Sequence, residues 1–333
     1  MQPRYVVVIG TSAGGIEALR VLVAALPADF PAAIAVVMHT SPLSPGILHD
    51  ILTRSGRLRS VIPTDGERLQ TGHIYVAPPD YHLLIEPNRL RITKGPRENR
   101  FRPAIDPLFR SAAQVYGPNA IGIILTGNLD DGAAGLWAVK QMGGVTIVQD
   151  PYEALFPGMP QNALRHVDAD HVVPLADIPP LLVRLTAQAT RAVAFQVPEP
   201  IEVEVKIARQ EDPREAGVHQ LGEPSTFACP ECHGVLLQVN DGGHIRFRCH
   251  TGHAYSPESL LVDIGEQIER QLWNAIRAIR EGTLLMQTMA EHAGEVPAPS
   301  DSRTLRVSAE ELERQADTLR QMITSGAAAV HAE

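Results

Sequence analysis

Hydrophobic and polar residues alternate in blocks along the first 185 positions, and these blocks predict strands and helices in turn. Apolar runs near positions 5, 34, 121 and 145 are hydrophobic throughout rather than at every second residue. Such runs are typical of strands buried on both faces, so we predict an α/β fold with a doubly wound, mostly parallel sheet and helices on both faces. The expected strands cover residues 5–9, 33–39, 74–77, 121–125 and 145–149, and the expected helices cover 16–26, 47–54, 107–115 and 132–142.

Residues 83–93 predict a small antiparallel hairpin beside this sheet, because two apolar arms flank a Pro-Asn-Arg turn. The first domain is expected to end at residue 187. Residues 188–226 are rich in proline and charge, and we interpret most of them as a linker. Within this stretch, apolar residues alternate with charged ones from Ile201 to Ile207. That period of two suits a short, half-exposed strand.

Two further segments follow the linker. Residues 227–256 contain every cysteine of the chain and predict a small Cys/His module. Within it, residues 233–248 can form a hairpin that brings the cysteines together, with Asn-Asp-Gly-Gly at 240–243 as its turn. From Pro257 onward, apolar residues recur every three or four positions, which predicts an amphipathic helix capped by Ser256. A break at 294–302 and a capping box that begins at Ser308 predict the start of a second helix. We expect residues 257–326 to form a helical hairpin, either within one chain or as a surface for self-association.

Composition narrows the class of protein. The net charge of −9 over 333 residues argues against a nucleic-acid-binding protein and against docking on an anionic membrane. No apolar run reaches the roughly 18 residues of a membrane span, and a strand begins too early to leave room for a signal peptide. The three clustered cysteines favour a reducing compartment and a metal rather than disulfides. We therefore expect a cytoplasmic protein.

Ser12 lies in the turn between the first expected strand and the first expected helix, within the pattern G-x-S-x-G. A tight turn at the end of a central strand exposes the serine side chain, and the N–H groups that open the helix favour negative charge at the same point. This setting suits a nucleophile. Two other interpretations stay open from this stretch alone, namely a helix N-cap and a glycine-rich loop that cradles a phosphate.

His39 and a pair of aspartates favour the nucleophile. His39 ends the second expected strand, where a dinucleotide-binding fold would carry an acid for the ribose. Asp130 and Asp131 follow a third buried strand. Because neighbouring parallel strands end at the same edge of a sheet, these side chains can meet Ser12 there and supply the set needed for acyl transfer. The glycine loop also lacks the lysine of a phosphate loop, although nucleotide binding stays an alternative that dinucleotide affinity would reveal.

Six motifs follow one another along the chain, IGTSAGG at 9–15, VVMHTSP at 36–42, IYVAPPDYHLLI at 74–85, RPAIDPLFRSAA at 102–113, LTGNLDDGAAGL at 125–136 and FPGMPQNAL at 156–164. Taken together and in this order, they resemble the catalytic domain of CheB-type chemotaxis protein-glutamate methylesterases. The resemblance spans residues 5–185 and implies a serine hydrolase that needs no cofactor for catalysis, with Ser12 as nucleophile, His39 as base and Asp131 as acid. Asp131 is preferred to Asp130 because the family's aspartate immediately precedes the glycine of D-G-A.

The same resemblance implies a substrate and its surroundings. The backbone N–H groups of Ala13 and Asn128 would hold the oxyanion, and His82, Arg102 and Met159 would line the substrate cleft. The substrate would be a glutamate methyl ester on a chemoreceptor or on another signalling protein. A glutamine side-chain amide is a second substrate that the same groups could hydrolyse.

The chain also departs from the family pattern. Ala13 replaces a frequent threonine, and Asn128 and Leu129 replace a Met-Gly pair before the aspartates. The chain begins directly on the first catalytic strand, so we expect no N-terminal receiver domain to control the enzyme by phosphorylation. An alternative of another class is a catalytically silent signalling adaptor that binds its partners through the C-terminal tail.

A second site is predicted in the Cys/His module. Cys229 and Cys232 form a C-x₂-C pair, and Cys249 and His253 follow as C-x₃-H with zinc-ribbon spacing. Four protein ligands leave no open position, so we predict a structural Zn²⁺. His253 is preferred to His250, which directly follows Cys249 and is poorly placed to share its ion. The alternative is three free cytosolic thiols.

Overall fold

The described residues of the computed structural model are 3–189, 195–241, 244–292 and 302–330. They belong to two compact units, Met1–Ser259 and Leu260–Glu333. No helix among these residues is both long enough and apolar enough to cross a lipid bilayer.

A sheet of seven parallel strands forms the centre of the first unit, in the order β3-β4-β2-β1-β7-β8-β9. The predicted parallel, doubly wound sheet is therefore confirmed. Every residue of β1 and β7 is buried, as their unbroken apolar runs require. The short edge strands β3 and β9 were not predicted. The strands are β1 (Val6–Thr11), β2 (Ala33–Met38), β3 (Arg59–Val61), β4 (His73–Val76), β7 (Ala120–Ile124), β8 (Val145–Gln149) and β9 (His171–Val173).

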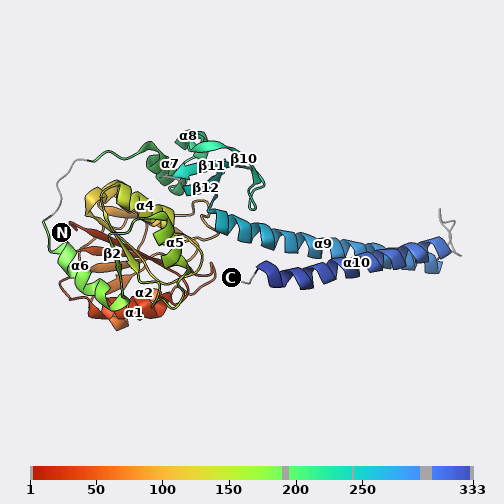
Figure 1. The fold of residues 1–333 in the computed structure, drawn as a ribbon, viewed down its shortest axis with the longest axis horizontal. Helices are drawn as coiled ribbons and strands as arrows, with labels where there is room; N and C mark the ends of the chain where they lie inside the picture. The colour runs from red at the N-terminus through yellow and green to blue at the C-terminus, as the bar shows by residue number, and fades with distance from the viewer. Residues whose placement is uncertain (1–2, 190–194, 242–243, 293–301, 331–333) are drawn as a thin grey trace. The chain divides into compact units, whose positions relative to one another are not determined.

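Helices cover both faces of this sheet (Figure 1). Buried leucines of α1, α2 and α6 pack on one face, and buried residues of α3, α4 and α5 pack on the other. The predicted hairpin is present as β5 and β6, a separate two-stranded sheet whose apolar residues join the second of these cores. The elements are α1 (Gly15–Ala25), α2 (Leu48–Ser55), α3 (Ile105–Tyr116), α4 (Ala133–Gln141), α5 (Gly158–His166), α6 (Ile178–Thr186), β5 (His82–Glu86) and β6 (Arg89–Thr93).

The strand predicted from Ile201 to Ile207 is wrong, because these residues lie in helix α7 (Glu199–Ala208). Ile201 and Val205 pack into the catalytic core, whereas Val203 and Ile207 pack against the Cys/His module. Each pair is four residues apart and lies on its own helix face, so a helix with two buried faces produced an apparent period of two. The stretch interpreted as a linker also contains α8 (Pro213–Ala216) and the start of β10 (Gly222–Ala228), while residues 190–194 lie outside the described residues.

The Cys/His module is a four-stranded antiparallel sheet in the order β10-β11-β12-β13. Strands β11 (Val235–Asp241) and β12 (His244–Cys249) form the predicted hairpin, and β13 (Ala254–Tyr255) follows the last candidate ligand. The two glycines of the predicted turn, residues 242–243, lie outside the described residues.

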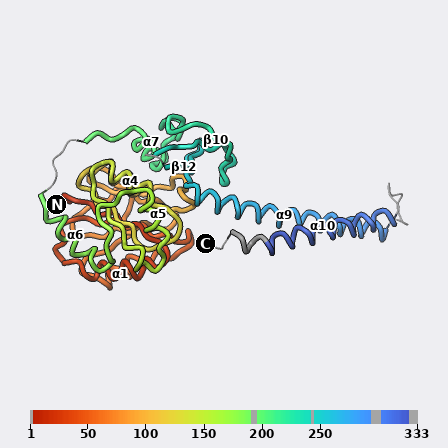
Figure 2. The backbone as a smooth tube through the Cα atoms, viewed as in Figure 1, coloured from red at the N-terminus to blue at the C-terminus, as the bar shows by residue number. Residues whose placement is uncertain are grey.

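The second unit is a pair of long helices that lie side by side, α9 (Pro257–His292) and α10 (Ser302–Val330) (Figures 1 and 2). Ile276, Ala316 and Ile323 are buried between them, which confirms a helical hairpin within one chain. Helix α9 begins at the predicted residue. The predicted start of α10 is wrong, because Ser308 lies inside this helix, and the predicted break at 294–302 falls almost entirely on residues that are not described.

Candidate active site and Cys/His cluster

The strand order of the sheet changes side at β1, because β2 to β4 lie on one side of β1 and β7 to β9 on the other. Ligands of doubly wound sheets bind outside the carboxyl ends of the strands at such a point. Thr11 pairs with Met38, so the next residues along the two strands are Ser12 and His39. The N–H of His39 donates to the carbonyl of Thr11 (3.2 Å) and that of Ser12 to the carbonyl of Thr126 (3.0 Å). The loops after β1, β2 and β7 therefore meet where the sequence predicted a site.

Ser12 does not cap helix α1. The N-cap of α1 is Gly14, with a left-handed φ of 73°, and no side chain accepts a hydrogen bond there. The positive φ suits glycine, because a Cβ at this position is strained. Hydroxyl groups fix the loop instead, since Thr11 Oγ1 donates to the carbonyl of Thr126 (2.8 Å) and Thr126 Oγ1 donates to the carbonyl of Ala13 (3.1 Å). The N-cap interpretation of Ser12 is therefore wrong, and within the described part of the chain the Ser12 hydroxyl has no hydrogen-bond partner.

His39 is bonded to Asp131. Its Nε2 lies 2.7 Å from Asp131 Oδ2, and the two side chains are 3% and 0% exposed. The ring of Phe101 stacks on the imidazole, with the ring centroids 3.6 Å apart. Since Nε2 is engaged by the carboxylate, Nδ1 carries the free lone pair, and this buried atom has no hydrogen-bond partner among the described residues. Nδ1 is therefore the basic atom available to a neighbouring hydroxyl group.

The Asp131 carboxylate is held ionised. Its Oδ2 accepts the N–H of Ile105 at the start of α3 (2.7 Å), and its Oδ1 accepts a hydrogen bond from Asn99 Nδ2 (3.0 Å). Burial alone would raise the pKa of Asp131, but hydrogen bonding to His39, the His39 charge and these donors hold the pKa below its usual value. A buried carboxylate with this support can stabilise an imidazolium.

Two neighbouring carboxyl groups behave differently. Burial raises the pKa of Asp130 to about 8, against the hydrogen bond from the Ser256 hydroxyl. Burial and the adjacent Asp131 charge raise the pKa of Asp106 to about 7. Carboxyl groups whose surroundings give them different pKa values take different roles in catalysis. Asp131 is the acid that both contacts His39 and stays charged, which supports the choice of Asp131 over Asp130.

Ala13, Asn128 and Met159 lie around Ser12. Among the described residues, no group accepts a hydrogen bond from the backbone N–H of Ala13 or of Asn128, so both donors are available. Met159 is buried, and its N–H donates to the carbonyl of Gly127 (2.8 Å). A Cβ on Gly127 would lie 2.1 Å from Met159 Sδ and 2.9 Å from Ser12 Cβ, so only glycine fits between them. Met159 therefore packs beside the nucleophile candidate.

His82 and Arg102 were predicted to line the same cleft, and the structure gives them other surroundings. His82 is completely buried, with Nε2 2.9 Å from the carbonyl oxygen of Pro96 and Nδ1 accepting the N–H of Ala104 (3.2 Å). Both ring nitrogens are engaged, so His82 cannot line a cleft. Arg102 is 18% exposed and pairs with Asp80 at 2.8 Å.

Asn99 and Phe101 are two residues of the site that sequence reasoning missed. Asn99 donates to the candidate triad acid, and Phe101 stacks on the candidate base. Neither belongs to a motif with a known chemistry, and both act through a turn whose position depends on contacts distant in sequence. We searched for polar residues directly after predicted strands, and neither Asn99 nor Phe101 lies at such a position.

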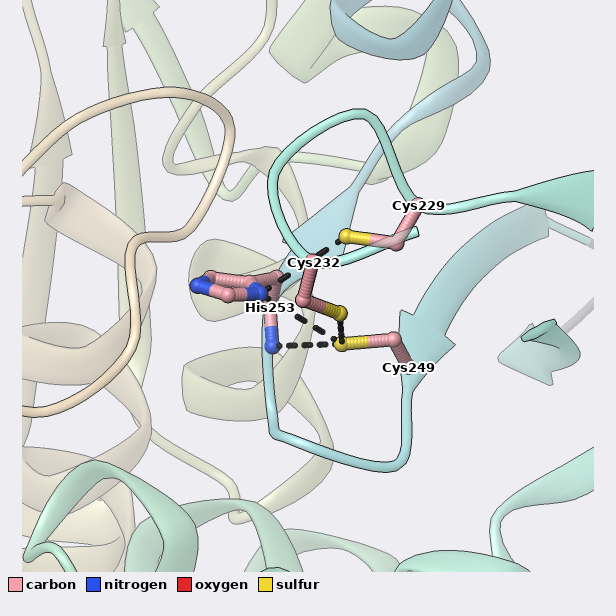
Figure 3. Close-up of side chains that lie close together, drawn as sticks. All are labelled: Cys229, Cys232, Cys249 and His253. Carbon is pink, nitrogen blue, oxygen red and sulfur yellow. Dashed lines mark hydrogen bonds between the residues drawn. The ribbon is translucent and has the colours of Figure 1, made fainter. Parts of the chain in front are cut away.

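The four predicted metal ligands converge in the Cys/His module (Figure 3). Cys229 and Cys232 come from the loop before β11, Cys249 ends β12, and His253 follows in the next turn. The three thiols form no disulfide. The ligand atoms all lie within 4.8 Å of one another, so a metal ion could be bound here.

The spacing within this cluster fits a tetrahedral ion. Bonds of about 2.3 Å to sulfur and about 2.0 Å to nitrogen place tetrahedral sulfurs about 3.8 Å apart, and sulfur and nitrogen about 3.5 Å apart. The Sγ atoms of Cys232 and Cys249 are 3.6 Å apart, and His253 Nδ1 lies 3.6 Å from Cys229 Sγ and 3.5 Å from Cys249 Sγ. The residues present therefore fit a closed four-ligand site.

The other nitrogen of His253 has the partner that a metal-binding histidine requires. Nε2 lies 3.3 Å from a carboxylate oxygen of Glu231. A carboxylate on the remote ring nitrogen fixes the tautomer and leaves the other nitrogen free to bind a metal. His250 packs against Gly234 instead, where a Cβ would lie 2.1 Å from the His250 ring. The geometry thus supports His253 over His250.

A serine, an imidazole and a buried ionised aspartate at adjacent strand ends of an α/β sheet are the arrangement that serine hydrolases use. The CheB methylesterase family model matches residues 7–182, and the chain belongs to this family. The crystal structure of the *Thermotoga maritima* CheB methylesterase catalytic domain is similar, with 35% identity and a TM-score of 0.52 over 54% of this chain and 98% of that one.

Two curated relatives extend the comparison. A *Leptospira interrogans* protein, provisionally named protein-glutamate methylesterase/protein-glutamine glutaminase, is 41% identical over 54% of this chain and 93% of its own length. Protein-glutamate methylesterase/protein-glutamine glutaminase 1 of *Xanthomonas euvesicatoria* is 43% identical over 55% of this chain and 52% of its own. The chain thus spans about half the length of the *Xanthomonas* relative. These matches concern the catalytic part and leave the Cys/His module and the helical hairpin outside the comparison.

Proposed function

We propose that this chain is a protein-glutamate methylesterase that uses Ser12, His39 and Asp131 as a catalytic triad. The observation that carries the proposal is the 2.7 Å contact between His39 Nε2 and a buried, ionised Asp131, at the strand end beside Ser12. A catalytically silent adaptor would have no need to keep an imidazole paired with a buried carboxylate. The proposed catalytic domain covers residues 1–187.

Acylation begins with proton transfer. His39 Nδ1 takes the proton of the Ser12 hydroxyl, and Oγ attacks the ester carbonyl of a methylated glutamate side chain. Asp131 stabilises the imidazolium through Nε2 and keeps the ring in the tautomer that leaves Nδ1 basic. The negative charge that develops on the carbonyl oxygen is held by the N–H groups of Ala13 and Asn128. Protonation by His39 then releases methanol.

Deacylation uses the same groups in reverse. Water enters where methanol left, His39 accepts one of its protons, and the hydroxide attacks the acyl-enzyme ester. The products are a free glutamate side chain and the restored Ser12 hydroxyl. A glutamine side chain would react in the same way with ammonia as the leaving group, which agrees with the double names of the relatives.

The proposed substrates are methylated chemoreceptors or another methylated signalling protein. Methanol release from receptor fragments methylated on glutamate tests this proposal, with ammonia release from the unmethylated glutamine form as a parallel assay. We expect the wild-type chain to release methanol at a rate proportional to enzyme concentration. Absence of methanol from every methylated fragment, together with binding to those fragments, would favour the adaptor instead.

We also propose that residues 227–256 hold one structural Zn²⁺ on Cys229, Cys232, Cys249 and His253. The ligand spacing and the Glu231 carboxylate behind His253 support this assignment. When bound, the ion would cross-link the two loops of the module. Self-association through α9 and α10 stays a prediction.

Metal analysis checks the zinc proposal. Protein purified without chelator should contain close to one zinc per chain, because a closed site with three thiolates binds tightly. The variant His253→Ala should lose most of this zinc, and the matched variant His250→Ala should keep it. Zinc-free wild-type protein, or equal loss in the two histidine variants, would refute the assignment.

A further inference from the structure

Asn99 joins the active site to the segment that follows the Cys/His cluster. Its side-chain amide is buried and uses its full hydrogen-bonding capacity. Nδ2 donates to Asp131 Oδ1 and to Asp106 Oδ2, each at 3.0 Å. Oδ1 accepts the N–H of Ser256 (2.9 Å) and the hydroxyl of Ser259 (3.2 Å). One side chain therefore contacts both the triad acid and the first turn of α9.

We infer that Asn99 is a positioning residue for Asp131, and that the Cys/His cluster holds Asn99 in place through the segment 254–259. This inference rests on the proposed triad and zinc site. The Cys/His module thereby acquires a role in catalysis. A change in the structure of the module would displace the Asn99 side chain, and this displacement would alter the position of Asp131. The contacts on the two sides of Asn99 carry the argument.

On the active-site side, Asn99 fixes the second oxygen of the acid. With Oδ1 held by Asn99, Oδ2 is the oxygen that points at His39 Nε2. The hydrogen bond also favours the ionised carboxylate. The same turn carries Phe101, whose ring stacks on His39, because the backbone groups of Glu98 and Phe101 bond to each other in both directions. Both the acid and the base of the triad are thus supported from this one turn.

On the module side, the turn is tied to the residues directly after His253. The N–H of Asn99 donates to the carbonyl of Ala254 (2.8 Å), and the N–H of Ala254 donates to the carbonyl of Arg97 (3.2 Å). Asn99 has a positive φ of 49°, a strained conformation that persists only when its surroundings enforce it. Ala254 and Ser256 provide that enforcement.

A buried ion pair makes a second connection between the module and this turn. Arg248, next to Cys249 on β12, lies 2.9 Å from a carboxylate oxygen of Glu98, and both side chains are almost completely buried. Arg248 also donates to the carbonyl of Gly252, inside the loop between Cys249 and His253 (2.8 Å). The turn at 97–101 is thereby held from both ends of the metal-binding loop.

A pH profile separates positioning from a merely structural role. The ionisable groups that face Asp131 are His39, Asp106 and, farther away, His82. Without the Asn99 donor the Asp131 carboxylate attracts a proton more strongly, both directly and through the imidazolium that it stabilises. The acid limb of kcat/KM for Asn99→Ala should therefore move to higher pH by about one unit. The value of kcat/KM at the optimum should fall by about 10–100-fold, as expected for a misplaced catalytic group.

Two serine variants complete the series. Ser259→Ala removes one of the two donors to Asn99 Oδ1. It should shift the acid limb of kcat/KM to higher pH, but by less than Asn99→Ala does. Ser225→Ala is the matched control on the module and should behave as wild type. Among the residues that the structure describes, the N–H of Phe227 is the one hydrogen-bond partner of the Ser225 hydroxyl. An acid limb that does not move in Asn99→Ala overturns the inference even if activity falls.

The link to the metal is tested on the full-length chain by removing zinc with a chelator. Hydrogen exchange should become faster at the amides of Asn99 and Phe101, and a fluorophosphonate should label Ser12 more slowly. Re-addition of zinc should restore both. Unchanged exchange and labelling in zinc-depleted protein would refute the coupling, whereas zinc-replete protein that neither releases methanol nor is labelled would instead refute the proposed function.

Discussion

Replacing Ser12 with alanine should lower kcat/KM for methanol release by about 10⁴-fold or more, because no other side chain can form the acyl-enzyme. Ser12 packs against Gly127, which separates it from Met159, and His39 with its unpartnered Nδ1 follows the neighbouring strand β2. The substitution removes one oxygen atom from a loop that threonine hydroxyls hold together, so the fold should stay intact. The residual rate should reflect the oxyanion donors and substrate binding alone.

The matched control is Ser41→Ala, two residues after His39. Ser41 is exposed, and its hydroxyl accepts the N–H of Leu43 and has no other hydrogen-bond partner in the described part of the chain. This variant should retain the wild-type rate. If Ser12→Ala keeps more than about a tenth of the wild-type kcat/KM, Ser12 is not the nucleophile, since loss of a triad serine costs several orders of magnitude.

The second large effect concerns stability. Arg248→Ala should lower the free energy of unfolding of the first unit by about 3 kcal/mol, because removal of one partner from a buried ion pair leaves its carboxylates under-compensated. Arg248 is 1% exposed and lies 2.9 Å from Glu98 and 3.3 Å from Glu204. Arg110 and Arg246 still contact these carboxylates, so the loss should stay at the lower end of the range for buried pairs.

Urea denaturation measures this change. The matched control is Arg214→Ala, because Arg214 is 70% exposed and pairs with the exposed Asp212. Surface pairs contribute little, so the control should leave the free energy of unfolding close to that of the wild type. Equal effects of the two substitutions would show that the buried cluster does not hold the module on the catalytic part.

The central sheet was predictable because its strands are buried on both faces. Every residue of β1 and β7 is buried, and the apolar runs 6–9 and 120–124 that form most of these strands predict them without further context. The edge strands β3 and β9 have three residues each and carry exposed positions, which leaves no periodic signal. Helix α7 was predicted to be a strand because it packs against two hydrophobic cores. The apolar residues of its two buried faces together recur at every second position, as in a strand.

The candidate triad was predictable for a related reason. Ser12, His39 and Asp131 each follow a buried strand, and parallel strands bring their carboxyl ends to one edge whatever the rest of the chain does. His82 lies in a matching motif, yet it does not line a cleft as predicted. Its side chain is buried by the segment 96–104, whose Pro96 and Ala104 bond to the ring nitrogens, and the motif does not show this contact. Asn99 could not be found, since its partners Ser256 and Asp131 are distant in the sequence.

The most direct test of the account is covalent trapping of the nucleophile. Wild-type protein treated with a fluorophosphonate should gain one adduct, and peptide mass spectrometry should locate it on Ser12. His39→Ala should be labelled far more slowly, because the serine loses its base. An adduct on any other residue, or labelling of His39→Ala at the wild-type rate, would contradict the assignment of Ser12 as a nucleophile activated by His39.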